Sequence, residues 1–341
     1  SQRNVKKDVT QINPVIKDAM EMLQKAALQK EGLSGLRTGF EGLDKMTSGW
    51  QNSDLIIIAA RPAMGKTAFV LSMAKNMAVN FNTPVALFSL EMSNVQLVNR
   101  LIVNVCEIPG EKIKSGRLES YEWEQLDFKI KELYDAPIFV DDTPSLSVFE
   151  LRTKARRLVR EHGIKIIIID YLQLMNASGM SFGSREQEVS TISRSLKGLA
   201  KELNIPIIAL SQLNRGVEAR QGAEGKRPQL ADLRESGAIE QDADMVCFIH
   251  RPEYYKITED ERGNSLIGLA EIIIAKHRNG AVGDVRLRFK SEFAKFMNVD
   301  EDVPVREFSS NMNSSGPMET MPPIPPAGTD FLAPGNNEVP F

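Results

Sequence analysis

The residues with the clearest chemical potential lie at positions 60–67, Ala-Arg-Pro-Ala-Met-Gly-Lys-Thr. An apolar run typical of a buried strand precedes them, and a stretch with helical spacing of apolar residues follows. A turn between a strand and a helix N-terminus presents backbone N–H groups to phosphate oxygens. Lys66 can then reach the β- and γ-phosphates of a nucleotide, and the Thr67 hydroxyl can bind magnesium. This context predicts a site for ATP and Mg²⁺.

We expect the backbone of this phosphate loop to hold the nucleotide. The residues concerned are Ala63, Met64, Gly65, Lys66, Thr67 and Ala68. The loop departs from the usual pattern at its first position, where Ala60 stands in place of glycine. Alanine is compatible with the start of the turn if its φ angle is negative.

Three polar residues end other apolar runs, at positions 91, 170 and 212. Side chains at the carboxyl ends of strands in an open α/β sheet face the ligand. Asp170 is therefore expected to hold magnesium through water, and Glu91 to polarise the water that attacks the γ-phosphate. Gln212 is a candidate sensor of the γ-phosphate. The alternative for Asp170 is a helix cap or a turn aspartate, and for Glu91 it is a carboxylate favoured by the dipole of the following helix. For Gln212 the alternative is a capping role, which this residue taken alone would favour.

Two cations flank a histidine in the segment 276–280, Lys-His-Arg-Asn-Gly. Asn-Gly is a strong hairpin signal, and on a strand Lys276 and Arg278 would share one face while His277 takes the other. Neighbouring cations repel unless an anion lies between them. A phosphate held by a neighbouring subunit would suit, with Arg278 as an arginine finger. A solvated hairpin edge guarded by charge is an equally supported alternative.

The elements that position these residues alternate along the chain. Strand-like apolar runs lie at 54–60, 85–90, 136–140, 164–169, 205–211, 245–250, 269–275 and 284–289. Helical stretches lie at about 66–80, 93–106, 121–135, 147–162 and 186–203. The run 164–169 is apolar on both faces, as a strand inside a parallel sheet requires. This order predicts an α/β fold with a mostly parallel twisted sheet, flanking helices and added antiparallel strands.

The chain ends differ from this central part. Residues 1–32 are interpreted as a linker with an amphipathic helix at 15–30, which must dock on its own domain or on a neighbouring copy. Residues 33–304 form the main domain. Residues 305–341 are rich in proline without a core-forming period, which predicts a disordered tail.

Composition narrows the class of protein. The net charge of −3 argues against coating nucleic acid by bulk charge, although a local basic channel remains compatible with it. Cys106 and Cys247 lie in apolar runs, which predicts buried thiols and a reducing cytoplasm. No apolar run is long enough to span a bilayer, and no signal peptide is recognisable. The three histidines lack the spacing of a zinc site.

Together these stretches resemble the C-terminal motor domain of the DnaB family of replicative helicases. The resemblance covers almost all of residues 33–299. It is most specific in Ser-Leu-Glu-Met-Ser (89–93), Asp-Leu-Arg-Glu-Ser-Gly (232–237) and Ala-Lys-His-Arg-Asn-Gly (275–280). It implies a RecA-like fold, a homo-hexameric ring with ATP bound between neighbours, and movement along single-stranded DNA in the 5′ to 3′ direction.

The resemblance also implies roles for individual residues. Glu91 matches the catalytic glutamate, Asp170 the Walker B aspartate and Gln212 the γ-phosphate sensor. Lys276 and Arg278 match residues supplied in trans. A separate loop matches the one that holds the DNA backbone in the central channel, and its residues are Arg234, Glu235 and Gly237. Main-chain amides contribute to such contacts, which reconciles DNA binding with an acidic chain.

The family further implies a helicase loader and clamp-loader type proteins as partners at the replication fork, with no membrane. The helix at 15–30 looks like the family's linker helix, which packs on the adjacent subunit. The family's N-terminal domain, which helps to form the ring collar and recruits primase, is not found in this sequence. We therefore expect reduced ring stability and no full primase binding. His277 replaces a residue that is often neutral and polar, and it is assigned no role.

Two other functions are compatible with a phosphate loop. One is a RecA- or RadA-like recombinase that forms filaments with little unwinding. The other is a regulatory ring ATPase in which ATP switches assembly and DNA is not moved. The segment 234–237 favours the helicase over both.

Overall fold

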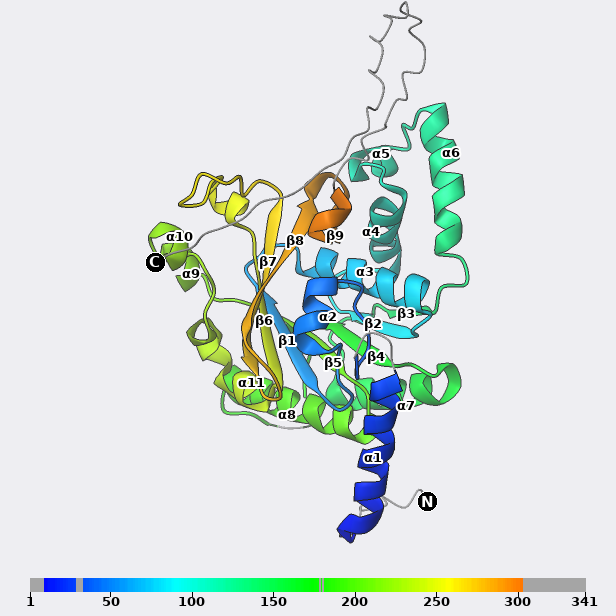
Figure 1. Ribbon diagram of the computed structural model, residues 1–341, viewed down its shortest axis with the longest axis vertical. Helices are drawn as coiled ribbons and strands as arrows, with labels where there is room; N and C mark the ends of the chain where they lie inside the picture. The colour runs from blue at the N-terminus through cyan, green and yellow to red at the C-terminus, as the bar shows by residue number, and fades with distance from the viewer. Residues whose placement is uncertain (1–8, 29–32, 178, 180, 303–341) are drawn as a thin grey trace, which may run out of the picture. The chain divides into compact units, whose positions relative to one another are not determined.

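The computed structural model describes residues 9–28, 33–177, 179 and 181–302, and these contain one sheet with nine strands. The strand order is β3-β2-β4-β5-β1-β6-β7-β8-β9, and it can be followed in Figure 1 from β3 on the right to β6 on the left. The strands are β1 (Leu55–Ala60), β2 (Val85–Ser89), β3 (Ile138–Asp141), β4 (Ile166–Asp170), β5 (Ile207–Gln212), β6 (Met245–His250), β7 (Leu269–His277), β8 (Gly283–Lys290) and β9 (Lys295–Met297).

The described helices are α1 (Ile12–Leu28), α2 (Glu41–Thr47), α3 (Lys66–Lys75), α4 (Asn94–Cys106), α5 (Gly110–Ser115), α6 (Ser120–Lys129), α7 (Val148–His162), α8 (Arg185–Leu203), α9 (Gly216–Ala219), α10 (Gly222–Gly225) and α11 (Gly237–Asp242). A π-helical turn continues α3 over Asn76–Asn80. Short 3-10 turns cover Ile130–Glu132, Leu172–Leu174, Leu230–Ser236, Pro252–Tyr255, Ser291–Phe293 and Val299–Asp302. None of these helices is long and apolar enough to cross a membrane.

Strands β1 to β6 pair in parallel, and β7, β8 and β9 extend the sheet in antiparallel pairing. The predicted fold class is therefore confirmed. Helices cover both faces of the parallel part. Ile56 and Ile58 of β1 belong to the apolar cluster that includes α3, whereas Leu55 and Ile57 belong to the cluster that includes α8. Fully burying one such side chain stabilises the fold by about 2 kcal/mol.

Parallel pairing brings the carboxyl ends of neighbouring strands to one edge of the sheet. Strands β2, β4, β5 and β1 lie side by side in that order. The residues predicted to bind the nucleotide and magnesium, to activate water and to sense the γ-phosphate all lie at the ends of these four strands or just after them. The fold therefore gathers into one place groups that are far apart along the chain.

The sequence missed several short elements and some element bounds. Helix α1 starts at Ile12 rather than at residue 15, because proline is tolerated in a first helical turn. Strands β4 and β5 begin two residues later than expected, because Ile164 and Ile205 are buried ahead of the ladder. Strand β9 has three residues, too few to show a period.

The two cysteines are free and buried, as predicted. Two predictions concern residues outside the described part of the chain. They are the end of the linker at 29–32 and the disordered tail at 305–341.

Candidate nucleotide site

The phosphate loop joins β1 to α3 in the predicted way. Ala60 is the last residue of β1 and does not have a positive φ, so alanine is accommodated there. Gly65 has a φ of +95°, and a Cβ at this position would lie 3.1 Å from the ring of Phe296. Glycine is therefore needed at position 65 for both its conformation and its space. Ala63 also has a positive φ, at 67°.

The first side chains of α3 meet the end of β4 and the backbone of β5 at this loop. The Thr67 hydroxyl donates a hydrogen bond to Asp170 Oδ2 at 2.8 Å. Lys66 Nζ lies 3.4 Å from the carbonyl oxygen of Ser211 and 4.9 Å from the centroid of the Tyr171 ring. The three residues predicted to contact phosphate and magnesium are thus adjacent, although Asp170 is 103 residues from Thr67 in the sequence.

Burial dominates the electrostatics of this cluster. It lowers the pKa of Lys66 to about 8, against the attraction of Asp170 and Glu91. It also raises the pKa of Asp170, which the hydrogen bond from Thr67 opposes. The carboxylate and hydroxyl oxygens of Asp170 and Thr67 are donors that suit Mg²⁺ with phosphate and water as its other ligands. No group of three or more His, Cys, Asp or Glu in the described residues could hold a metal alone.

Glu91 follows β2 and is exposed at the same edge. The backbone N–H of Leu90 donates to the carbonyl of Asp170 at 2.8 Å, which holds Glu91 beside the cluster. The following helix, α4, is capped by Ser93, whose hydroxyl accepts from Gln96 N at 3.3 Å. Ser93 therefore caps this helix, and the alternative for Glu91, a carboxylate favoured by the dipole of the same helix, is also compatible with this geometry.

Gln212 ends β5, and its backbone is tied to a residue that the sequence analysis had not singled out. Gln173 Nε2 donates to Ser211 Oγ at 2.8 Å, and Gln173 Oε1 accepts from Gln212 N at 3.4 Å. Both glutamines line a cavity of about 380 Å³, which also reaches Asp232 and Leu233. The predicted sensor therefore lies between the phosphate loop and the segment predicted to bind DNA.

Lys276 and Arg278 lie at the opposite edge of the sheet. Strand β7 ends at His277, so Arg278 lies one residue beyond the strand, in the turn, and both cations contact carbonyl oxygens of α11. Arg278 Nη1 contacts Asp244 Oδ1 at 3.2 Å, and Arg278 N donates to the Asp244 carbonyl at 2.9 Å. Lys276 Nζ donates to the carbonyl of Glu240 near the end of α11. These acceptors in the same chain thus offset the repulsion between Lys276 and Arg278.

Asp244 marks where these cations lie relative to the phosphate loop. Its Oδ2 accepts a hydrogen bond at 2.8 Å from the N–H of Leu55, the first residue of β1. The phosphate loop leaves the other end of β1, six residues later. At about 3.3 Å per residue, the two ends are separated by roughly 20 Å. Within one chain, Arg278 therefore cannot reach the phosphates that Lys66 would hold.

The third predicted group lies between these two edges. Arg234 and Glu235 belong to the 3-10 turn Leu230–Ser236, and Gly237 begins α11. Gly237 has a φ of −54°, and no atom lies within 4 Å of the Cβ position that another residue would occupy there. Packing within the described residues does not require glycine at this position. Glycine there leaves the main chain open to close approach by a ligand.

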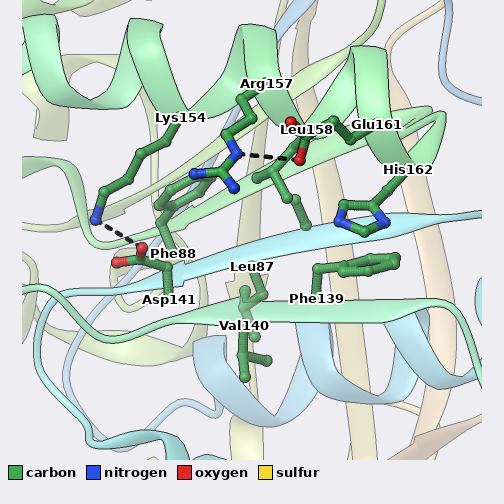
Figure 2. Close-up of a pocket in the computed structure, with 11 residues that line it drawn as sticks. Leu87, Phe88, Phe139, Val140, Asp141, Lys154, Arg157, Leu158, Glu161 and His162 are labelled. Atoms are coloured by element: carbon green, nitrogen blue, oxygen red, sulfur yellow. Dashed lines mark hydrogen bonds and ion pairs between the residues drawn. The ribbon is translucent and has the colours of Figure 1, made fainter.

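A separate cavity of about 280 Å³ lies between α7 and strands β2 and β3 (Figure 2). Its charged groups pair with one another, Lys154 with Asp141 at 2.7 Å and Arg157 with Glu161 at 3.0 Å. The rings of His162 and Phe139 contact each other with centroids 4.5 Å apart and planes tilted by 31°. None of the predicted site residues lines this cavity.

Known proteins are similar to this chain in both sequence and fold. The family model for the DnaB-like helicase C-terminal domain matches residues 35–298. The replicative DNA helicase DnaB of Geobacillus stearothermophilus is 51% identical over 284 residues, which are 83% of this chain and 60% of that protein. The replicative DNA helicase DnaC of Bacillus subtilis is 47% identical over 290 residues, 85% of this chain and 62% of that protein. The chain thus spans about three fifths of the length of these relatives.

One solved structure shows the similarity at the level of the fold. A DnaB-like replicative helicase, described with its interactions with primase, superposes with a TM-score of 0.74 at 41% identity. That match covers 87% of this chain and 68% of the other. A second solved structure, which is an ATPase domain, superposes with a TM-score of 0.78 at 40% identity, over 86% of this chain and 100% of that one.

Proposed function

Because this chain belongs to the family of DnaB-like helicase C-terminal domains, we propose that it is the ATP-hydrolysing motor of a replicative DNA helicase. Six copies form a ring with ATP between neighbours, and the ring moves 5′ to 3′ along single-stranded DNA. We also propose that it acts at the replication fork and that a helicase loader and clamp-loader type proteins bind it.

The hydrolytic half of the site comes from one subunit. The backbone of residues 63–68 and the amine of Lys66 hold the phosphates. Thr67 and Asp170 hold Mg²⁺, which when bound supplies positive charge to the phosphate oxygens. Glu91 takes a proton from a water molecule, and the oxygen of that water bonds to the γ-phosphorus. The bond between the γ-phosphorus and the bridging oxygen breaks, which gives ADP and phosphate. Gln212 senses whether the γ-phosphate is present.

The other half of the site comes from a neighbouring subunit. The position of Lys276 and Arg278 supports this proposal. They lie at the edge of the sheet where β1 begins, a full strand length from the phosphate loop of their own chain. If these cations act on a phosphate, it is held by another copy of the chain. Arg278 then stabilises charge on the γ-phosphoryl group as it transfers.

DNA is held by the segment 234–237, with Arg234 and Glu235 on the turn and Gly237 at the start of α11. Main-chain N–H groups can bind backbone phosphates without a large positive surface. The net charge of −3 is compatible with such binding. Successive ATP hydrolysis around the ring passes the strand from one such segment to the next.

The deciding experiment measures ATP hydrolysis with and without single-stranded DNA for wild type, Lys66→Ala, Arg278→Ala and a mixture of the two variants. Each variant alone should lose hydrolysis, because each lacks one half of every site. The mixture should recover part of it, since sites that pair an intact Lys66 with an intact Arg278 form between unlike subunits. Arg262→Ala, which removes an exposed arginine elsewhere, should behave as wild type.

DNA stimulation together with recovery on mixing would support the motor. Hydrolysis that ignores DNA, with no recovery on mixing, would contradict it and favour a regulatory ATPase. DNA-dependent hydrolysis by filaments that do not unwind a duplex would favour a recombinase.

A further inference from the structure

Two ion pairs connect the phosphate loop to the segment proposed to bind DNA. Arg61, the second residue of the phosphate loop motif, is buried at 8% exposure. Its Nε and Nη2 both donate to Glu218 Oε1 at 3.0 Å, and its Nη1 donates to the carbonyl of Leu213 at 2.8 Å. A buried guanidinium is costly to leave unpaired. Displacement of this part of the loop must therefore displace α9, which contains Glu218.

The second ion pair begins two residues after Glu218. Arg220 Nη2 contacts Asp232 Oδ2 at 2.8 Å, and the Asp232 side chain is largely buried. Asp232 also caps the 3-10 turn Leu230–Ser236, because its carboxylate accepts from the N–H of Gln229. That turn contains the backbone of residues 234–236 and leads directly into Gly237.

Few apolar contacts hold the intervening chain in place. Apart from Val217, Pro228 and Leu233, the described side chains of residues 214–233 are exposed or half-buried. The segment consists of the two short helices α9 and α10 and of turns. Segments with few buried apolar contacts rearrange at low free-energy cost. Ion pairs, which include those of Arg227 with two carboxylates on β7 and β8, therefore determine where this segment lies more than the core does.

We infer that Arg61, Glu218, Arg220 and Asp232 form a relay that couples the nucleotide state of the phosphate loop to the DNA affinity of residues 234–237 in the same subunit. The inference rests on the proposed function. These four are positioning residues, since none of them is assigned a contact with the reacting atoms. The relay is distinct from the sensor Gln212, which ends β5 and is tied to Gln173.

The test measures binding of a fluorescent thymidine oligonucleotide to the full chain in ADP and in a non-hydrolysable ATP analogue. The measured quantity is the ratio of the oligonucleotide affinities in the two nucleotide states. Coupling between two sites on one protein typically changes affinity by about 5- to 150-fold, so wild type should show a ratio in that range. Glu218→Gln and Asp232→Asn each remove one charge and keep an acceptor oxygen. Each should bring the ratio to within about twofold of one while affinity for the ATP analogue stays within about threefold of wild type.

A double-mutant cycle separates a relay from two independent structural supports. If the ion pairs act in series, the variant with both substitutions should lose no more of the ratio than either single variant. The matched control is Glu224→Gln on the exposed surface of α10, which should keep the wild-type ratio. Thermal unfolding of each variant identifies any that fails to fold, and the remaining single variant then decides the question.

The relay is overturned if either folded single variant keeps the wild-type ratio. It is also overturned if the two losses multiply in the double variant, or if the ratio falls only together with nucleotide affinity. Wild-type protein that binds no oligonucleotide would overturn the proposed function along with the relay. A wild-type ratio above about fivefold that both single variants retain would overturn the relay alone.

Discussion

In the proposed function, nucleotide binding acts most directly on the ionisation of Lys66. Its amine lies against the face of Tyr171 and a backbone carbonyl, and burial lowers its pKa to about 8. Phosphate oxygens placed next to an amine favour its charged form. Nucleotide binding and protonation of Lys66 should therefore be linked.

Titration calorimetry should detect this linkage as uptake of a proton. At about pH 8.5 the Lys66 amine is mostly neutral before ATP binds and is charged afterwards, whereas at about pH 7 it is charged in both states. The binding enthalpy at the higher pH should therefore depend on the ionisation enthalpy of the buffer, and at the lower pH it should not. Lys66→Arg, if it binds ATP, should show no uptake, because arginine stays charged. Buffer-independent enthalpies for wild type at both pH values would refute the linkage.

At the scale of elements, charged side chains gather at the edge of the sheet where β1 and β6 begin. Asp244 accepts hydrogen bonds from Leu55 N at 2.8 Å and from Lys197 Nζ at 2.6 Å, in addition to its contact with Arg278. Asp54 lies one residue before β1. Burial first, and the charge of Asp244 second, raise the pKa of Asp54 to about 6.

The raised pKa of Asp54 makes a prediction about stability. A carboxyl whose folded pKa exceeds its unfolded value resists ionisation, so the fold loses stability as pH rises from about 4 through about 6. Asp54→Asn should remove this loss and stabilise the protein at about pH 7.5 by about 1 kcal/mol, after a discount for partial exposure. Urea denaturation at about pH 4.5 and about pH 7.5 measures the difference.

The matched control for that comparison is Asp127→Asn on the exposed face of α6. It should change stability equally little at both pH values. An Asp54→Asn variant that is no more stable than wild type at about pH 7.5 would show that Asp54 ionises freely in the folded protein.

At the scale of the whole molecule, one subunit holds the two halves of the proposed site at opposite edges of its sheet. Assembly is then a condition for hydrolysis. Helix α1 offers a means of assembly, because none of its residues is buried and its apolar stripe includes Val15, Ile16, Met20 and Leu23, each at least 50% exposed. We therefore propose that this helix packs on the adjacent subunit, as the family resemblance implies.

Charged residues in that stripe should therefore weaken the ring without unfolding the domain. We expect Met20→Glu combined with Leu23→Glu to lower the molar mass measured by light scattering after gel filtration, with little change in thermal unfolding. Lys17→Gln combined with Gln24→Glu changes the net charge equally on the polar side of the helix and should leave the mass unchanged. An unchanged mass for the first variant would remove α1 from the assembly.

The sequence by itself determined the elements and the chemistry at their ends. Runs of β-branched residues, helical spacing and the turn 60–67 are local patterns, and they predicted the sheet, its antiparallel extension and the places of Lys66, Asp170, Glu91 and Gln212. The DNA segment came from resemblance to a family. The residues alone left Lys276 and Arg278 between supply in trans and a solvated hairpin edge, and the resemblance favoured the first. These roles stay proposals.

Only the tertiary structure decided which of these residues meet. The strand order placed β2, β4, β5 and β1 together, and pairing with α11 and Asp244 placed Arg278 at the far edge. The relay depends on contacts such as Arg61 with Glu218, which are 157 residues apart. The energies of such contacts depend on the burial and distance of both partners in the folded chain. No local pattern in the sequence carries that information.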